Sequence, residues 1–277
     1  MRGKTVLISG GNSGIGAAAA QALAERGARL VLACRDLGKA ERVRDGIATR
    51  SGKEDIHVLP LDLASFASIR ELATSVQQRF ERLDVLINNA GLFPAQKILT
   101  EDGFEAQFGI NHLGHFLLTH LLLDLLRASG PARVINVTSM MHRFGSIDFA
   151  SFRGETAYSP WRAYFQSKLA NLLFSNELAR RLAGTGITSN ALHPGGVKTD
   201  IMRDASPTNR LFSQLFFNSP ERGARTSVYL ASSPEVEGVT GGYFIACKAR
   251  RPAPVARDEA LARRLWEESA DLCGTGW

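Results

Sequence analysis

Cysteine and long apolar runs are both scarce in this sequence. The 277 residues include three cysteines. Their odd number and wide spacing give neither a disulfide framework nor a metal motif, and they fit a reducing compartment. The longest apolar run, Phe116–Leu126, is interrupted by polar residues and is shorter than the ~20 residues that a membrane-spanning helix needs. We therefore expect no membrane span.

The sequence also shows no strong excess of one charge, no linker and no leader signal. The chain carries 33 basic and 27 acidic residues, a net charge of +6, which is too small and dispersed to predict a nucleic-acid partner. The densest basic run, Lys248–Arg251, is interpreted as solvated surface. No proline- or serine-rich linker and no internal repeat is present. Strand-like residues begin at Lys4, so we expect no signal peptide and predict a cytoplasmic protein with residues 1–277 in one domain.

What the sequence does contain is a regular alternation of strand-like and helical segments. Apolar residues make up 44% and charged residues 22% of the chain, which excludes a disordered polar chain. The seven expected strands are Thr5–Ser9, Arg29–Cys34, Ile56–Pro60, Asp84–Ile87, Arg133–Val137, Ile187–Leu192 and Gly242–Ala246. The expected helices are Ile15–Arg26, Leu37–Arg50, Ser65–Phe80, Gly103–Arg127, Pro160–Ala183, Pro220–Ala231 and Arg257–Leu272. This pattern predicts an α/β fold with a doubly wound, mostly parallel, Rossmann-like sheet and helices on both faces.

A glycine-rich turn follows the first expected strand and opens the first expected helix. Gly10, Gly14 and Gly16 have the spacing GxxxGxG. Without side chains the backbone can turn sharply and approach a pyrophosphate, to which the helix N-terminus offers N–H groups and a partial positive charge. The context predicts a dinucleotide site. A purely structural helix start is the alternative.

The end of the second expected strand bears on which dinucleotide binds. A carboxylate there usually binds the ribose 2′-hydroxyl of NAD, and Asp36 is a candidate. Asp36 better suits the N-cap of the next helix, which leaves Arg35 to face the ribose, and a guanidinium matches a 2′-phosphate. The sequence therefore favours NADP, with Arg35 as an ordinary surface charge as the alternative.

Tyr164 and Lys168 are four residues apart and share one helix face. Free tyrosine has a pKa of ~10, so acid–base work near neutral pH needs a lowering of roughly three units, about 4 kcal/mol. An ammonium about 4 Å away at an effective dielectric of ~20 supplies ~4 kcal/mol. The charge of Lys168 alone could therefore lower the Tyr164 pKa by the required amount. A tyrosine followed four residues later by a lysine is, however, common by chance.

Short polar or glycine-containing turns follow the fourth, fifth and sixth expected strands. They are Asn88–Gly91, Thr138–Ser139 and His193–Gly196. The carboxyl ends of parallel strands are where doubly wound sheets bind ligands. Together with the Tyr164–Lys168 pair, these turns predict one site at that edge.

Over nearly its whole length the sequence resembles the short-chain dehydrogenase/reductase family. The segments that carry the resemblance are SGGNSGIG, ACRD, Asp62-Leu63, NNAG, NHLGHF, NVTSM, YFQSK and HPGGVKT. GGNSGIG, ACRD, NHLGHFLLT and SKLANLLFSNELARRL are similar to the retinol-dehydrogenase-like subgroup, as is the spacing of 25 residues from Ser139 to Tyr164.

The resemblance implies hydride transfer between NADP(H) and a carbonyl or alcohol. It implies that Tyr164 is the general acid–base and that Lys168 lowers its pKa and binds the nicotinamide ribose. Ser139 is implied to hold the substrate oxygen, so Ser139 and Tyr164 are the predicted substrate contacts, and Asn111 supports a proton-relay water. The residues expected to bind the cofactor are Gly10, Asn12, Ser13, Gly14, Ile15, Gly16, Arg35, Asp62, Leu63, Asn89, Ala90, Gly91, Tyr164, Lys168, Pro194, Gly195, Val197 and Thr199.

Two positions at the glycine turn depart from the family pattern, and a third bears on the choice of cofactor. Ser9 stands where threonine is usual and keeps the hydroxyl, and Gly11 stands where alanine is usual. Ser13 occupies a position at which many NADP-binding members carry a basic residue. The resemblance therefore leaves Arg35 as the main contact for the 2′-phosphate.

Residues 198–219 are expected to form a lid over the site. Apolar residues of the lid and of nearby turns could form a cleft for a lipophilic aldehyde, ketone or alcohol of retinoid or lipid type. They could instead only pack the lid on the core. They are Ile201, Met202, Leu211, Phe212, Leu215, Phe216, Phe217, Phe93, Met140, Met141, Phe144 and Trp161.

Two other functions stay open at this point. An NADP-dependent epimerase or dehydratase would be longer and would have a differently spaced glycine turn. A redox-sensing regulator that binds the dinucleotide without turnover would be expected to lack Tyr164, Lys168 or Ser139, and all three are present.

The remaining histidines and the apolar helix have plain interpretations. His112 and His115 have no further ligand at metal spacing, so we expect helix packing and no metal site. His193 is expected to shape its loop. The segment His115–Leu126 is either covered within the fold or packs on a partner. The resemblance adds that this helix and Pro160–Ala183 often form a dimer bundle, so a homodimer is predicted.

Overall fold

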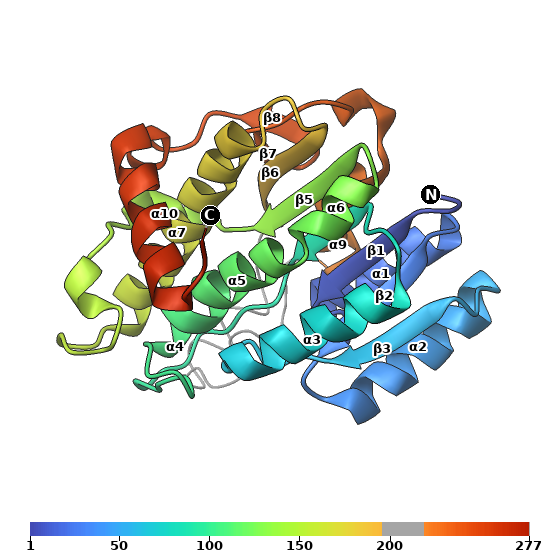
Figure 1. The fold of residues 1–277 in the computed structure, drawn as a ribbon, viewed down its shortest axis with the longest axis horizontal. Coiled ribbons are helices and arrows are strands. Elements are labelled where there is room, and N and C mark those ends of the chain that lie inside the picture. The colour runs from blue at the N-terminus through green and yellow to red at the C-terminus, as the bar shows by residue number, and fades with distance from the viewer. Residues whose placement is uncertain (196–218, 277) are drawn as a thin grey trace.

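A computed structural model describes residues 1–195 and 219–276, with an eight-stranded sheet at its centre (Figure 1). The strands pair in the order β3-β2-β1-β4-β5-β6-β7-β8. Every neighbouring pair is parallel except β7 with β8. The strands are β1 (Thr5–Ser9), β2 (Arg29–Cys34), β3 (Ile56–Pro60), β4 (Val85–Asn88), β5 (Ala132–Val137), β6 (Ile187–His193), β7 (Tyr243–Ile245) and β8 (Lys248–Arg250).

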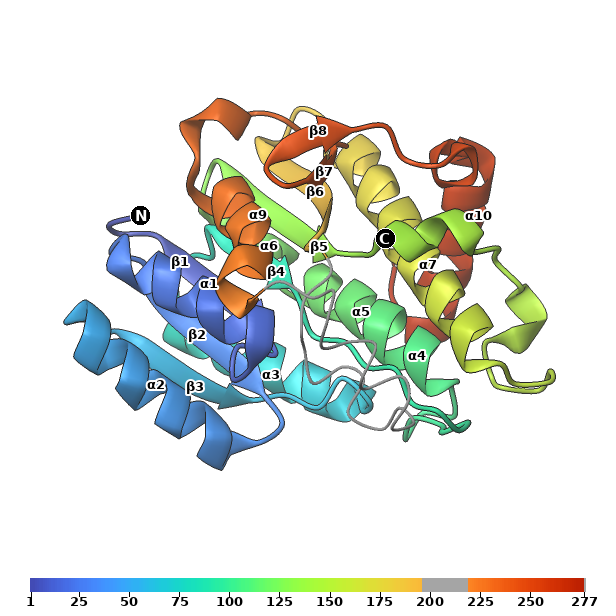
Figure 2. The same ribbon diagram turned by 180° about the vertical axis from the view of Figure 1, so that it is seen from behind.

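Helices cover both faces of the sheet, which confirms the predicted doubly wound architecture. Helices α1, α2 and α9 lie on one face (Figure 2), and α3, α5, α6, α7 and α10 lie on the other (Figure 1). The helices are α1 (Gly14–Glu25), α2 (Leu37–Ser51), α3 (Phe66–Arg79), α4 (Ala106–Phe108), α5 (Gly114–Leu121), α6 (Leu123–Ala128), α7 (Pro160–Arg181), α9 (Pro220–Ser232) and α10 (Glu259–Cys273).

Alternating side chains of the strands divide the core into two layers. In β1, Leu7 packs in the layer that contains α3, α5, α7 and α10. Its neighbours Val6 and Ile8 pack in the layer that contains α1, α2 and α9. Because the central strands are buried on both faces, their sequences are continuous apolar runs rather than alternating ones.

The order of the strands reverses between β1 and β4. Strands β2 and β3 extend the sheet on one side of β1, and β4 to β8 extend it on the other. The connections that follow β1 and β4 therefore diverge at the carboxyl edge of the sheet, where folds of this type bind ligands. The glycine turn after Ser9 and the Asn89–Gly91 loop meet at this point.

Two details of the fold differ from the sequence prediction. An eighth strand, β8, pairs with β7 and is formed by the basic run, which is exposed as expected. Its three charged or small residues are too few to give a strand signal. The helix expected over residues 103–127 consists instead of α4, a π-helical turn (Gly109–Leu113), α5 and α6. Apolar spacing does not reveal such changes in hydrogen-bond register.

The apolar segment of α5 is covered within the chain. Phe116, Leu117 and Leu118 are fully buried, and α5 lies against α3 and α10. This selects the first of the two alternatives, and the homodimer stays a prediction. No helix in residues 1–195 and 219–276 combines the length and the apolar character needed to cross a membrane.

Candidate active site and cofactor cradle

The glycine turn after β1 has a backbone that only glycine accommodates well. Gly10 and Gly14 have φ angles of +67° and +48°, which side-chain-bearing residues rarely adopt. A Cβ atom on Gly16 would lie 2.3 Å from the carbonyl oxygen of Gly10 and 2.7 Å from the side-chain nitrogen Nδ2 of Asn89. No side chain fits at Gly16, so the turn keeps the bare backbone that a close pyrophosphate contact requires.

The N-terminus of α1 is left without a side-chain cap. Ser13 occupies the N-cap position but makes no capping hydrogen bond, and the first turn has no acidic residue. Helices α2, α3, α7, α9 and α10 are capped by Asp36, Ser65, Ser159, Ser219 and Asp258, respectively. Free N–H groups and the positive end of the helix dipole beside a glycine turn suit an anion. The residues present therefore fit a dinucleotide cofactor.

Ser9 ties the loop after β4 to the glycine turn. Its Oγ accepts hydrogen bonds from the backbone N–H groups of Asn89, at 2.9 Å, and Ala90, at 3.0 Å. The Asn89 side chain donates in return to the Ser9 carbonyl at 2.9 Å. The hydroxyl that stands where the family usually has threonine is thus used, and the two loops form one unit.

Arg35 and Asp36, the two residues at the end of β2 that could select the cofactor, make different contacts. Asp36 caps α2 by accepting from the Lys39 N–H at 2.9 Å, as the sequence predicts. The Arg35 side chain is 76% exposed, and its nearest guanidinium nitrogen is 4.0 Å from a carboxylate oxygen of Asp62. Asp62 also accepts from the Ala64 N–H at 2.9 Å. Arg35 is therefore held only loosely and is accessible to an anion.

Ser139 and Tyr164 come together from different elements. Ser139 follows β5, whereas Tyr164 lies near the start of α7, which Ser159 caps. The Ser139 hydroxyl lies close enough to the Tyr164 phenol to lower its pKa. Lys168 lies one turn further along α7, with its Nζ atom 5.7 Å from the centre of the Tyr164 ring. Its carbonyl accepts from the Thr138 hydroxyl at 2.5 Å, which joins α7 to the end of β5.

Burial dominates the electrostatics of this cluster. Burial raises the pKa of the Tyr164 phenol, and the nearby Ser139 hydroxyl opposes that rise. Burial also lowers the pKa of the Lys168 ammonium to about 8, although Nζ donates to the Val137 carbonyl at 3.4 Å. The attraction of the Lys168 ammonium would lower the pKa of the phenol, as expected from the sequence, but the cost of burying a phenolate acts in the opposite direction and is the larger effect here.

Asn111 lies in the π-helical turn before α5 and borders the same space. Its side-chain amide is fully engaged, because its nitrogen donates to Ser167 Oγ at 3.1 Å and to the Leu92 carbonyl at 3.2 Å. Its oxygen accepts from the Leu92 N–H at 2.9 Å. A Cβ atom on Gly91 would lie 3.2 Å from Asn111 Oδ1 and 3.5 Å from Lys168 Nζ. The side chain thus fixes the loop after β4 beside the lysine.

The histidines have different roles. His112 packs among aromatic rings and lies 2.9 Å from Ser269 of α10, which confirms the packing interpretation. His115 connects Ser9 with the carbonyl of Asn111. We did not predict this connection; the available signal was a histidine one helical turn after Asn111. In the part of the chain that the structure describes, no three His, Cys, Asp or Glu residues are arranged to hold a metal ion.

Aromatic side chains lie beside the Ser139–Tyr164 pair. The ring of Phe93 packs edge-on against Tyr164 at 5.3 Å between centroids and lies 4.7 Å from Trp161. Phe144 and Trp161 are 69% and 45% exposed. Both of these exposed rings contact Phe165, the residue after Tyr164, with centroid distances of 5.7 and 5.8 Å, and they offer a surface for an apolar ligand.

Part of the predicted site lies outside the described residues. Pro194 and Gly195 follow β6 at the carboxyl edge. Val197, Thr199 and residues 198–218 of the proposed lid fall in the range that the structure does not describe. The choice between a lid that lines a cleft and one that only packs on the core therefore stays a prediction.

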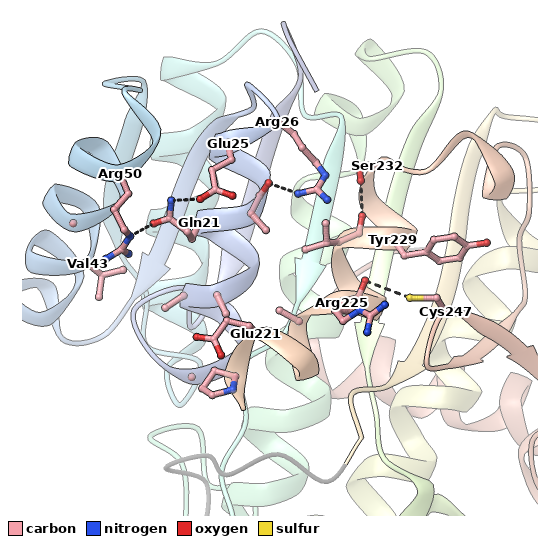
Figure 3. Close-up of a pocket in the computed structure, with 18 of the residues that line it drawn as sticks. Gln21, Glu25, Arg26, Val43, Arg50, Glu221, Arg225, Tyr229, Ser232 and Cys247 are labelled. Atoms are coloured by element: carbon pink, nitrogen blue, oxygen red, sulfur yellow. Dashed lines mark hydrogen bonds between the residues drawn. The ribbon is translucent and has the colours of Figure 1, made fainter. Parts of the chain in front are cut away.

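A groove of about 990 Å³ lies between α1, α2 and α9 (Figure 3) and includes Gly14 of the glycine turn at one end. On its rim Gln21 donates to Glu25 and accepts from Arg50. None of the hydroxyl and ammonium groups described above lines it. Volume alone would therefore misplace the site, whereas the polar residues at the carboxyl edge of the sheet indicate it.

Known proteins resemble this chain along almost its whole length. A sequence model of a family described as short chain dehydrogenase matches residues 4–210. Human retinol dehydrogenase 14 is 47% identical over 293 residues, covering 99% of this chain and 87% of that protein. The crystal structure of an uncharacterized protein from Mycobacterium Paratuberculosis has a TM-score of 0.80 at 38% identity, covering 99% of this chain and 94% of that one. The Pseudomonas aeruginosa RhlG/NADP active-site complex has a TM-score of 0.69 at 30% identity, covering 88% and 94%.

Proposed function

The chain belongs to the short-chain dehydrogenase family, and on that premise we propose that it is an NADP(H)-dependent oxidoreductase acting on a lipophilic carbonyl compound or alcohol. The observation that carries the proposal is the placing of the Tyr164 phenol near the Ser139 hydroxyl, which lowers its pKa, with the buried Lys168 ammonium 5.7 Å from the Tyr164 ring centre. This trio lies at the same edge of the sheet as the glycine turn, so a cofactor on the turn would lie beside it.

The residues that would hold the cofactor lie along this edge. The glycine turn and the uncapped N-terminus of α1 would bind its pyrophosphate. Asp62 and Leu63 would flank the adenine, the Asn89–Gly91 loop would line the middle, and Pro194, Gly195, Val197 and Thr199 would border the nicotinamide, as the family resemblance implies. When bound, NADPH supplies the hydride that the substrate carbon receives.

The side chains of this chain manage the proton and the substrate oxygen. Ser139 would orient the carbonyl oxygen, and the Tyr164 hydroxyl would give that oxygen its proton. Burial keeps the Tyr164 phenol protonated, which suits reduction. In the oxidative direction the phenolate must form, and the Lys168 ammonium then stabilises its charge.

The preference for NADP rests on the end of β2. Arg35 is exposed and only loosely held, whereas Asp36 is engaged as a helix cap. A guanidinium can bind a 2′-phosphate through two hydrogen bonds, and a solved relative was obtained as an NADP complex. These observations favour a phosphorylated ribose over the hydroxyl of NAD.

Exposed aromatic side chains near the start of α7 support the proposed substrate class. Trp161 and Phe144 offer apolar contact but no charge to a ligand, which favours a long or cyclic hydrocarbon chain that ends in an aldehyde, ketone or hydroxyl. The similarity to proteins named retinol dehydrogenase supports a retinoid-like substrate. The proposal also places the protein in the cytoplasm, as a homodimer. Light scattering on the purified protein measures its molar mass and so tests the dimer.

A panel assay tests the proposed reaction. The protein is mixed with NADPH or NADH and with retinal, alkanals of increasing chain length, and sugars, and cofactor oxidation is followed by absorbance. We expect turnover with NADPH and the lipophilic aldehydes. Binding of NADPH without turnover across the panel would favour the redox sensor. Conversion of substrate with no net cofactor oxidation would favour the epimerase or dehydratase.

A further inference from the structure

His115 lies in α5, one helical turn after Asn111, and is 3% exposed. Its Nδ1 atom is 3.0 Å from the main-chain carbonyl oxygen of Asn111. Its Nε2 atom is 2.8 Å from Ser9 Oγ at the end of β1. Both ring nitrogens therefore contact elements of the proposed site.

These contacts define where the ring carries its proton. A carbonyl oxygen can only accept, so His115 Nδ1 must be the donor to Asn111. Burial lowers the pKa of His115 to about 4, so the ring is neutral near pH 7 and Nε2 must be an acceptor. The Ser9 hydroxyl is then the donor to Nε2.

The hydrogen bonds around Ser9 independently indicate that its hydroxyl donates to His115 Nε2. Its Oγ already accepts from the N–H groups of Asn89 and Ala90, which occupies both of its lone pairs. Its hydrogen is left to donate, and the choice is between Nε2 of His115 at 2.8 Å and the Ile87 carbonyl at 3.4 Å. The shorter contact is the better hydrogen bond.

We propose that His115 is a positioning residue that joins the cofactor cradle to the turn containing Asn111. On one side it orients the Ser9 hydroxyl so that both lone pairs hold the Asn89–Gly91 loop. On the other it holds the main-chain carbonyl of Asn111, in a π-helical turn whose register differs from the helix that follows. The inference rests on the proposed function.

His112, in the same helical segment, is a buried histidine that has only a packing role. It is as deeply buried as His115, but its partners are Ser269 of α10 and aromatic rings of the core. Its replacement should affect folding alone, so it is the matched control.

Two substitutions of His115 separate its two hydrogen bonds. In His115→Asn the side-chain nitrogen takes the place of Nδ1 and can still donate to Asn111, but it does not reach Ser9. In His115→Gln the amide reaches towards Ser9, and the bond to Asn111 is lost. We expect His115→Asn to weaken NADPH binding roughly tenfold with kcat kept, and His115→Gln to lower kcat roughly tenfold with NADPH affinity kept.

NADPH affinity is measured by titration without substrate, and kcat in the panel assay with the best aldehyde. His112→Asn should lower the melting temperature and leave both parameters near wild type. If both His115 variants instead lose affinity and kcat in parallel, in proportion to their loss of melting temperature, His115 has only a packing role and the proposal is overturned.

A direct measurement on the wild-type protein does not depend on turnover or on the stability of any variant. With ¹⁵N-labelled histidine, the NMR shifts of the His115 ring should show a protonated Nδ1 and an unprotonated Nε2 at pH 7. The opposite tautomer, or a charged ring, would refute the network even if the protein proves to be an active dehydrogenase. The expected tautomer together with an inactive protein would instead count against the proposed function.

Discussion

The Nζ atom of Lys168 lies 5.7 Å from the centre of the Tyr164 ring, and the lysine side chain is 3% exposed. Among residues 1–195 and 219–276 no carboxylate forms an ion pair with this ammonium, and an unpaired ammonium is costly to bury. Its value lies in the charge that it presents to the phenol. Burial of Lys168 therefore lowers the stability of the folded protein, while its charge supports acid–base chemistry at Tyr164. Both the stability and the activity can be measured.

Replacing Tyr164 by phenylalanine removes the proton donor and leaves the ring packing against Phe93. We expect kcat to fall by roughly 10²–10⁴, the usual contribution of general acid–base catalysis, while NADPH affinity changes little. Steady-state kinetics and a binding titration measure the two quantities. Tyr229→Phe, at the exposed groove, is the control and should be indistinguishable from wild type. An active Tyr164→Phe enzyme would contradict the assignment.

The buried ammonium predicts a pH-dependent stability. The pKa of Lys168 is about 8 in the folded protein and ~10.4 in an unfolded chain. Between these values the unfolded state binds more protons, so the free energy of unfolding should rise as the pH rises. Below about pH 8 the burial cost is fully present.

Lys168→Met removes that cost. The variant should be more stable than wild type by roughly 1–3 kcal/mol at pH 7, and the difference should shrink towards pH 10. Urea unfolding of both proteins without cofactor, at several pH values, measures it. A difference that stays constant over this range would show that the lysine pKa is not lowered.

Removing the guanidinium of Arg35 should discriminate between the cofactors. A charge-assisted hydrogen bond contributes about 1.5–3 kcal/mol, so Arg35→Ala should raise the KM for NADPH by roughly 10–100-fold and barely change that for NADH. The control is Arg44→Ala, because Arg44 pairs with Glu41 and Asp45 on α2. Equal losses with NADPH and NADH would argue against a contact with the 2′-phosphate.

Two glycine substitutions should have opposite effects on stability. In Gly16→Ala the new Cβ would overlap the Gly10 carbonyl at 2.3 Å, so we expect a loss of ~1–3 kcal/mol together with weaker NADPH binding. In Gly46→Ala, within α2, the nearest atom is a side-chain nitrogen of Arg50 at 3.7 Å, and a gain of ~0.5–1 kcal/mol is expected. Thermal unfolding compares the two, and a stable, NADPH-binding Gly16→Ala protein would show that the turn relaxes.

The sheet and the main helices could be predicted from the sequence because local signals agree with the fold. Asp36 marks the start of α2 in the sequence and caps it in the structure. Buried strands such as β1 are continuous apolar runs, and the spacing of Tyr164 and Lys168 places both on one side of α7. Each of these signals lies within a few neighbouring residues.

Other features depend on residues far apart in the chain. His115 and Ser9 are separated by more than a hundred positions, yet they share a hydrogen bond. The direction of the Tyr164 pKa shift depends on how deeply the fold buries the phenol, and the π-helical turn at Asn111 depends on what the helix packs against. None of these follows from local patterns, because tertiary packing decides them.

The sheet ends beyond β7 in the short hairpin strand β8, whose residues Lys248, Ala249 and Arg250 are all exposed. An outermost strand offers unpaired backbone groups to any strand of another molecule, which is a route to aggregation. Here that row is only three residues long, and two of them are cationic. If the β8 strands of two copies of this chain paired, cationic side chains would face each other for very few hydrogen bonds, so this edge of the sheet disfavours edge-to-edge pairing.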